Sequence, residues 1–256
     1  MATAVVRYTA AAMTDRGRKR TSNEDAFGYS VEHGVYLVCD GMGGAAAGEI
    51  ASSLAVDEVL RLVTERRDAQ NGNGAGSGSI AQIGEEAVIA ANETIHSRGQ
   101  RNLRLSGMGT TLVGLLAAVS EGDPRVWILN VGDSRCYRLR KGHIQQCTRD
   151  HSLVEEQIRL GRMTRSEAAR SPFRNVITRA LGTQMGVKPD VVEAEVEPGD
   201  LFLLCSDGLT RELSDEKIRS LLSTAAPLEE HCARLIQAAN KAGGHDNITC
   251  LLVRVG

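Results

Sequence analysis

Aromatic residues, long apolar runs and closely spaced cysteines are scarce in this sequence, and each shortage excludes a class of protein. Phe, Trp and Tyr make up 3% of the 256 residues, which argues against the stacking platforms that bind single-stranded nucleic acids. No run approaches the roughly 18 apolar residues of a membrane-spanning helix. The N-terminus lacks the basic start and apolar stretch of a signal peptide. We therefore expect a cytoplasmic protein that does not associate with a membrane.

An excess of charge of one sign is also missing. Thirty Lys and Arg residues face 32 Asp and Glu residues, which gives a net charge of −2. A general nucleic-acid binder needs a basic excess to neutralise phosphates, so this balance argues against that class. The length suits one large domain or two small ones, and it is sufficient to bury a core without disulfides.

The six cysteines are scattered, with no CxxC pair that would indicate zinc or redox chemistry. Several lie inside apolar runs, where a free cysteine behaves as a small hydrophobic residue. We predict reduced, structural thiols, as is usual in a cytosolic protein. The six are Cys39, Cys136, Cys147, Cys205, Cys232 and Cys250.

Short apolar runs bounded by Gly or Asp predict strands that are buried on both faces. These runs cover residues 35–39, 111–119, 126–131, 201–205 and 248–253. Two further predicted strands, 136–139 and 143–147, flank Lys141-Gly142, which predicts a hairpin turn.

Apolar residues at helical spacing predict helices over 49–66 and 80–96, a third that Ser214 caps, and a fourth from Pro227 to Gly243. Between the first two lies the segment 70–79, whose Gly, Asn and Ser residues predict a surface loop. A domain linker is the alternative, but the strand pattern continues beyond it without a change of composition. We therefore expect one domain over residues 1–256.

Residues 152–182 contain a capping box, Thr164 to Glu167, but few strong apolar residues. This combination indicates a partly exposed insertion over the core. Because strands and helices do not alternate regularly along the chain, we expect an α+β sandwich rather than a parallel sheet.

Acidic residues mark the ends of predicted strands. Asp40, Asp133 and Asp207 each follow an apolar run, and Asp246 precedes one. Antiparallel strands can bring all four to one end of a sheet. A single Asp there is usually structural, because Asp favours turns. A converged set is different: two carboxylates about 4 Å apart repel by about 4 kcal/mol at an effective dielectric constant near 20, so the set needs a cation. All-oxygen ligation indicates Mg²⁺ or Mn²⁺ rather than zinc.

Other residues extend this candidate site. Glu24 and Asp25 add two carboxylates, and Gly41 allows the backbone to approach so that a carbonyl can join the ligands. Arg20 lies five residues before Asp25. A guanidinium beside a metal cluster suits a phosphate substrate, because its fork binds two phosphate oxygens at once. From spacing alone, an exposed position in the basic patch at 16–20 explains Arg20 equally well.

Taken together, eight blocks of the sequence resemble, in family order, the metal-dependent PPM/PP2C family of Ser/Thr protein phosphatases. The blocks are RTSNEDA at 20–26, DGMGG at 40–44, GMGTT at 107–111, NVGDSR at 130–135, TRDHS at 148–152, NVITRALG at 175–182, CSDGLT at 205–210 and GGHDNIT at 243–249. One block alone is a weak signal, whereas eight in order across nearly the whole chain are a specific one.

The resemblance implies a four-layer α-β-β-α sandwich, in which helices flank two antiparallel sheets and the 152–182 insertion is the flap. It also implies two Mn²⁺ or Mg²⁺ ions in a cleft at one end. Asp40 would bridge the ions, Asp207 and Asp246 would complete the shell of the first, and the carbonyl of Gly41 would bind the second.

By the same resemblance, Glu24 and Asp25 would support the second ion, directly or through water. Asp133 matches the position that helps to bind a third, weaker ion in bacterial members. Arg20 would hold the substrate phosphate. The implied reaction is direct attack of a metal-activated water on phosphoserine or phosphothreonine, with no covalent phosphoenzyme.

One position departs from the family pattern. Many eukaryotic members carry His as the third residue of DGHGG, proposed as the general acid, whereas this chain has Met42. A thioether cannot donate a proton, so the acid is unassigned; we interpret His245 and His151 as structural. The resemblance implies an active monomeric phosphatase that opposes a Ser/Thr kinase and acts on phosphoproteins. The alternative is a pseudophosphatase that binds phosphoproteins without turnover, although such relatives usually lose metal-binding Asp residues.

Overall fold

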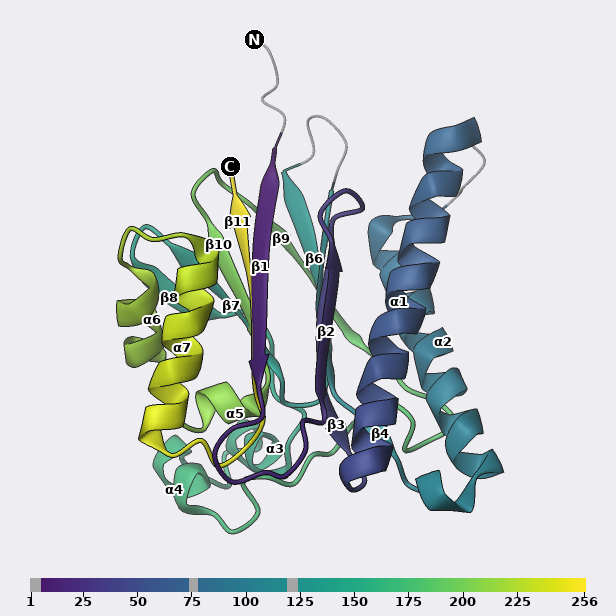
Figure 1. Cartoon of the computed structure of the whole chain (residues 1–256), viewed down its shortest axis with the longest axis vertical. Helices are drawn as coiled ribbons and strands as arrows, with labels where there is room; N and C mark the ends of the chain where they lie inside the picture. Colours follow the sequence, from purple (N-terminus) through teal and green to yellow (C-terminus); the bar gives the residue numbers. More distant parts are fainter. Residues whose placement is uncertain (1–5, 74–77, 119–123) are drawn as a thin grey trace.

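Two antiparallel sheets stack face to face, with helices on both outer faces, in the computed structural model of the chain (Figure 1). The structure describes residues 6–73, 78–118 and 124–256. This arrangement confirms the predicted α+β sandwich with the layer order α-β-β-α.

Every strand pair in both sheets is antiparallel. The first sheet has the order β1 (Tyr8–Asp15), β11 (Ile248–Val255), β10 (Leu201–Cys205), β7 (Arg135–Arg140) and β8 (His143–Gln146). The second has the order β2 (Asp25–Ser30), β3 (Val35–Met42), β5 (Leu112–Ala117), β6 (Arg125–Val131) and β9 (Asp190–Glu195), and the short β4 (Gly109–Thr110) pairs with β3.

The uninterrupted apolar runs become strands because both of their faces are buried. In β3, Leu37 packs toward the helices, whereas Tyr36 and Val38 pack between the two sheets. In β10, Leu203 faces the helices and Phe202 faces the other sheet. Alternate side chains therefore contribute to two different apolar layers, and no position in such a run is left for a polar residue.

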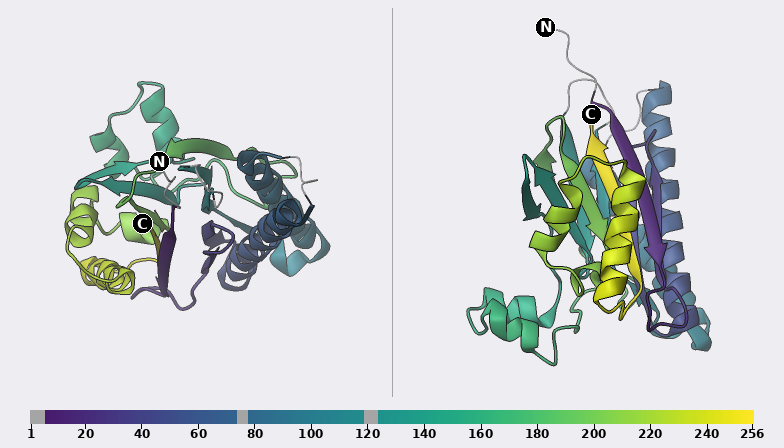
Figure 2. Two further views of the ribbon diagram at one scale, coloured as in Figure 1. Left: turned by 90° about the horizontal axis from the view of Figure 1, so that it is seen from above. Right: turned by 60° about the vertical axis from the view of Figure 1, so that its left-hand side comes forward.

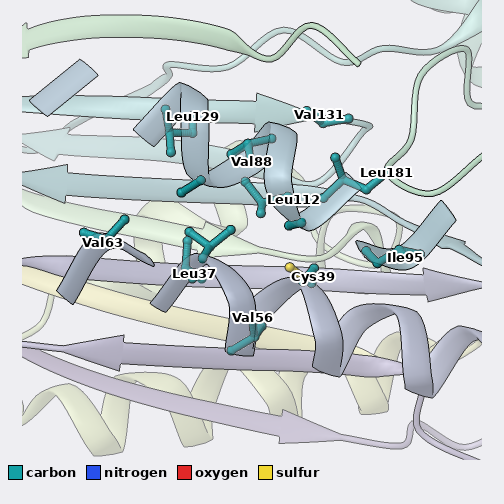
Figure 3. Close-up of a cluster of buried hydrophobic side chains, with 14 of the residues drawn as sticks. Leu37, Cys39, Val56, Val63, Val88, Ile95, Leu112, Leu129, Val131 and Leu181 are labelled. Carbon is teal, nitrogen blue, oxygen red and sulfur yellow. The ribbon is translucent and has the colours of Figure 1, made fainter. Parts of the chain in front are cut away.

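Helices close the two outer layers. The long pair α1 (Ala45–Asn73) and α2 (Ile80–Arg101) covers the second sheet, and Figure 3 shows Val56, Val63 and Val88 of these helices against Leu37 and Leu129. On the first sheet lie α6 (Asp215–Leu222) and α7 (Leu228–Ala242). The 3₁₀ helix η1 (Leu103–Leu105) follows α2.

The predicted boundary of the first helix is wrong at both ends. Helix α1 begins at Ala45 and continues to Asn73, so the first four residues of the predicted loop 70–79 are helical. The residues of α1 that precede this loop are good helix formers. Near the end of α1, the guanidinium of Arg67 donates to the carbonyl of Ala117 on the sheet, 2.9 Å away, and this bond holds the end of the helix in place. Residues 74–77 of the predicted loop lie outside the described residues, and Ser79 caps α2.

Four strands, β1, β2, β9 and the two-residue β4, have no counterpart among the predicted strands. The first three mix buried and exposed positions, so their apolar signal is weak, and β4 is too short to give one. The predicted hairpin at Lys141-Gly142 is present between β7 and β8, and both of its residues have positive φ, 50° and 80°.

Two short helices, α3 (Leu153–Arg159) and α4 (Arg165–Arg170), lie in the segment predicted as an insertion. They stand away from the sandwich at the end where α5 (Asp207–Thr210) lies (Figure 2). The expected capping box from Thr164 to Glu167 is formed. All six cysteines are free, as predicted. None of the described helices combines the length and the apolar character needed to cross a membrane.

Candidate metal and phosphate site

The predicted acidic residues meet at the end of the sandwich where α5 lies (Figure 1). Asp25 and Asp40 are directly paired between β2 and β3. Asp207 begins α5 two residues after the end of β10, and Asp246 lies two residues before β11. The acids therefore come from both sheets rather than from one. They lie close together because the two stacked sheets end at the same level.

Asp25 is held by hydroxyl groups of the opposite sheet. Its Oδ2 accepts hydrogen bonds of 2.7 Å from Ser206 Oγ and from Thr249 Oγ1. Asp40 is fixed through its backbone, since its N–H donates to Thr111 Oγ1 at 3.0 Å and its carbonyl accepts from Thr110 Oγ1 at 2.9 Å. These bonds fix the backbone of Asp40, and its carboxylate lies near the other acids.

Arginines face the acids of the first sheet. Asp246 Oδ2 accepts from Arg20 at 2.8 Å and from Arg211 at 3.0 Å. Arg211 also contacts the carboxylate of Asp207. Both arginines are partly exposed, with 47% of the Arg20 side chain and 34% of the Arg211 side chain accessible. Arg20 therefore lies at the acid cluster rather than in an isolated basic patch.

Glu24 lies beside this cluster, only 8% exposed. Its backbone N–H donates to Asn247 Oδ1 at 2.9 Å, and Asn247 Nδ2 donates to the carbonyls of Arg16 and Ser22. Asn247 thereby fixes the segment that carries Arg20, Glu24 and Asp25 against the start of β11.

Two glycines allow the backbone to approach closely. A Cβ on Gly41 would lie 2.1 Å from the carbonyl oxygen of Gly48 and 2.6 Å from that of Glu24. A Cβ on Gly208 would lie 1.9 Å from the carbonyl oxygen of Asn247. Because these contacts are with backbone atoms, no side chain fits at either position.

Burial and mutual repulsion favour the neutral forms of these acids. Burial, followed by the charges of Asp25, Asp207, Asp133 and Asp246, holds the pKa of Asp40 well above its usual range. Burial is also the largest cause at Asp25, where it raises the pKa to about 6. Burial and the charge of Asp133 raise the pKa of Asp207 to about 8, although Arg211 opposes the shift. An assembled cluster of ionised acids therefore requires positive charge.

The donor chemistry of these residues fits divalent cations. Among the described residues, the Oδ1 atoms of Asp25, Asp133 and Asp207 are buried without a hydrogen-bond partner, and all available donors are oxygens, as Mg²⁺ and Mn²⁺ prefer. In that same part of the chain, no three His, Cys, Asp or Glu side chains are gathered tightly enough to hold an ion as they stand. The side chains would have to close in, and the guanidinium of Arg211 already contacts the two acids of the first sheet, Asp207 and Asp246.

The two histidines interpreted as structural both have protein partners. His151 Nδ1 accepts from the N–H of Gly132 at 3.0 Å, and its Nε2 lies 3.0 Å from Arg179 Nη1. Arg179 also donates to Asp190 at 2.7 Å, which attaches the segment after α4 to β9. His245 pairs with Glu212 at 2.7 Å.

The sequence reasoning missed Arg211, Asn247 and the hydroxyls of Ser206 and Thr249. Ser206, Asn247 and Thr249 lie inside two of the quoted blocks, beside Asp207 and Asp246, so adjacency to a predicted ligand was the available signal. Arg211 follows its block by one residue, and only its position four residues after Asp207, one turn of helix, pointed to a contact.

Comparisons with known proteins point to one family. The family model described as protein phosphatase 2C matches residues 14–253. The Ser/Thr phosphatase stp of Listeria innocua is 37% identical over 246 residues, which cover 94% of this chain and 93% of that protein. The Ser/Thr protein phosphatase PstP of Mycobacterium tuberculosis is 39% identical over 99% of this chain and 46% of its own length.

Solved structures show the same similarity. The crystal structure of Mycobacterium tuberculosis PstP/Ppp has a TM-score of 0.85 at 36% identity, covering 98% of this chain and 99% of that chain. The catalytic domain of PstP in complex with two manganese ions has a TM-score of 0.84 at 35% identity, with the same coverage. The chain therefore belongs to the protein phosphatase 2C family, the metal-dependent PPM-type Ser/Thr protein phosphatases.

Proposed function

We propose that this protein hydrolyses phosphoserine and phosphothreonine in proteins at a pair of Mn²⁺ or Mg²⁺ ions. The observation that carries the proposal is the convergence of buried acids from both sheets, three of them with an unpartnered oxygen, beside the guanidinium of Arg20. A relative with the same fold was solved with two manganese ions, which supports the choice of metal.

The roles proposed for the acids follow their positions. Asp40, which lies near acids of both sheets, would be a ligand shared by the two ions, and Asp207 and Asp246 would complete the site of one ion. The carbonyl of Gly41, together with Glu24, serves the other. When bound, two such ions supply Lewis-acid activation of water and neutralise charge on the phosphoryl group.

Asp25 supports the second ion, either directly through its unpartnered Oδ1 or through water. Asp133 is a candidate ligand for a third, weaker ion, since its Oδ1 also lacks a partner and its side chain is buried.

Arg20 binds and orients the substrate phosphate. Its side chain is half exposed and lies against Asp246, at the border between the acids and solvent, and its planar fork suits two phosphoryl oxygens. Met42 cannot protonate the leaving group, and His245 is engaged with Glu212, so neither is assigned as the acid.

At the level of the whole chain, we propose one catalytic domain over residues 1–256 with residues 152–182 as its flap. The substrates are phosphorylated proteins, including targets of a Ser/Thr kinase, and the protein acts as a monomer. A comparison of phosphoproteins in cells with and without the protein identifies the targets. Accumulation of no phosphoserine or phosphothreonine site would contradict this part of the proposal.

The direct test is hydrolysis of a phosphothreonine peptide by the purified protein in MnCl₂ and in EDTA. We expect phosphate release that requires Mn²⁺, slow release from a phosphotyrosine peptide, and release reduced by about a hundredfold in an Asp207→Asn variant. Asp57→Asn, which changes an exposed acid on α1, is the control and should keep wild-type activity. Binding of the peptide without Mn²⁺-dependent release would instead favour the pseudophosphatase alternative.

A further inference from the structure

Arg211 occupies a central position among the acids. It follows α5 directly, and its backbone N–H donates to the carbonyl of Asp207 at 2.8 Å. Its Nη1 donates to Asp246 Oδ2 at 3.0 Å, and its Nη2 contacts Asp207 Oδ2. One guanidinium thus joins the two acids of the first sheet, whose positions are separated by 39 residues along the chain (246 − 207).

The charge of Arg211 also acts on acids that it does not touch. Burial raises the pKa of Asp133, and the charge of Arg211 is the largest influence that opposes this shift. The charges of Asp207, Asp133, Asp246 and Asp40 in turn favour the cationic form of Arg211. The nearby Arg135 is engaged elsewhere, because it binds both oxygens of Asp150 at 2.6 to 3.1 Å.

We propose that Arg211 is an internal counter-cation of the metal site: it holds Asp207 and Asp246 together in the metal-free chain and leaves their oxygens when a divalent ion binds. This inference rests on the proposed function, because it takes both acids to be ligands of one ion. A guanidinium and a divalent ion that contact the same pair of carboxylates lie close together, and the two cations repel each other. Arg211 therefore stabilises the metal-free protein and raises the metal concentration that the site requires.

A purely structural role for Arg211 predicts something different. If the side chain only anchored the end of the four-residue helix α5, its loss would destabilise the metal-free and metal-loaded forms equally. A counter-cation contributes to the metal-free form alone. The two roles therefore differ in how the melting temperature responds to Mn²⁺.

Arg211→Gln keeps most of the side-chain length and removes the charge. Arg219→Gln is the matched control: Arg219 pairs with Glu216 on α6, and 38% of its side chain is exposed, against 34% for Arg211. Mn²⁺ binding to the wild type and both variants is measured by isothermal titration calorimetry after EDTA treatment. Melting temperatures are recorded in EDTA and in saturating Mn²⁺.

We expect Arg211→Gln to bind Mn²⁺ about tenfold more tightly than the wild type, because one nearby positive charge is removed. Its melting temperature should fall in EDTA and match the wild type in Mn²⁺, while Arg219→Gln keeps the wild-type dissociation constant. Unchanged Mn²⁺ affinity of Arg211→Gln, or an equal loss of melting temperature in both conditions, overturns the inference alone. A wild-type protein that takes up no Mn²⁺ overturns the proposed metal site as well.

Discussion

The two sheets bring acids to the same end of the molecule but compensate them in different ways. On the second sheet, Asp25 has hydroxyl donors and Asp40 faces four other acids. On the first sheet, Asp246 accepts from two guanidinium groups and Asp207 contacts one of them. The second sheet relies on neutral partners and proton uptake. The first relies on arginine, although burial and the charge of Asp133 also raise the pKa of Asp207 to about 8.

This difference shows how an acid-rich site can stay folded before it receives a cation. Protonation removes the repulsion on the side of Asp40, whereas Arg20 and Arg211 neutralise the side of Asp246. Bound divalent ions would take the place of both the protons and the arginines. Substitutions on the two sides should therefore have similar effects on activity and different effects on the stability of the metal-free protein.

The largest effect is expected for Asp40→Asn. Activity in saturating Mn²⁺ should fall more than a hundredfold, beyond the roughly 10–100-fold typical for residues outside the direct metal ligands. The free energy of unfolding in EDTA should not fall, because the amide replaces a carboxyl that burial and four acids already shift toward its neutral form. Phosphate release and urea unfolding measure the two quantities. Clear destabilisation in EDTA would show that Asp40 has an ionic partner after all.

Asp246→Asn tests the first sheet, where arginines neutralise the acids. Activity should again fall, by about a hundredfold, but the metal-free protein should now lose about 1 kcal/mol of stability. Two guanidinium groups lose their carboxylate, and the loss is small because both are partly exposed. Equal unfolding midpoints for Asp246→Asn and Asp40→Asn in EDTA would remove the distinction between the two sheets.

The stability of the metal-free protein should fall as the pH rises from about 4 to 8. Asp25 and Asp207 have pKa values raised to about 6 and about 8. In this range the folded state binds more protons than the unfolded chain, so stability decreases with pH, by at most about 1.4 kcal/mol per pH unit for each group. Unfolding in EDTA at several pH values measures the slope. Saturating Mn²⁺ should remove the decline, and a decline that persists in Mn²⁺ would exclude these two acids as its cause.

The fold was predictable from the sequence where strands are buried on both faces. The runs that form β3, β10 and β11 are uninterrupted, because each face meets an apolar layer. Strands β1 and β9 were not predictable in this way, because each lies at the edge of its sheet and has several exposed positions. Helix α1 was predicted too short, since its last turns depend on the tertiary contact from Arg67 to Ala117.

In the site, the acids were predictable because they interrupt apolar runs at strand ends. Their partners were not, since the contacts join distant positions: Arg20 meets Asp246 across 226 residues, and Thr249 meets Asp25 across 224. Spacing alone gives no information on such pairs. The prediction that the acids come from one sheet was wrong for the same reason. Pairing between distant segments decides which sheet a strand joins.

The smallest effect is expected for Thr249→Val, which tests the hydroxyl link between the sheets. Valine keeps the shape of the side chain but removes the 2.7 Å donor to Asp25 Oδ2, so stability in EDTA should fall by about 1 kcal/mol and the pKa of Asp25 should rise. Thr14→Val is the matched control: Thr14 Oγ1 bonds Thr249 Oγ1 at 2.7 Å, and none of its own bonds reaches Asp25. If both variants lose the same stability with the same pH dependence, the Thr249 hydroxyl acts as an ordinary strand contact and does not specifically hold Asp25.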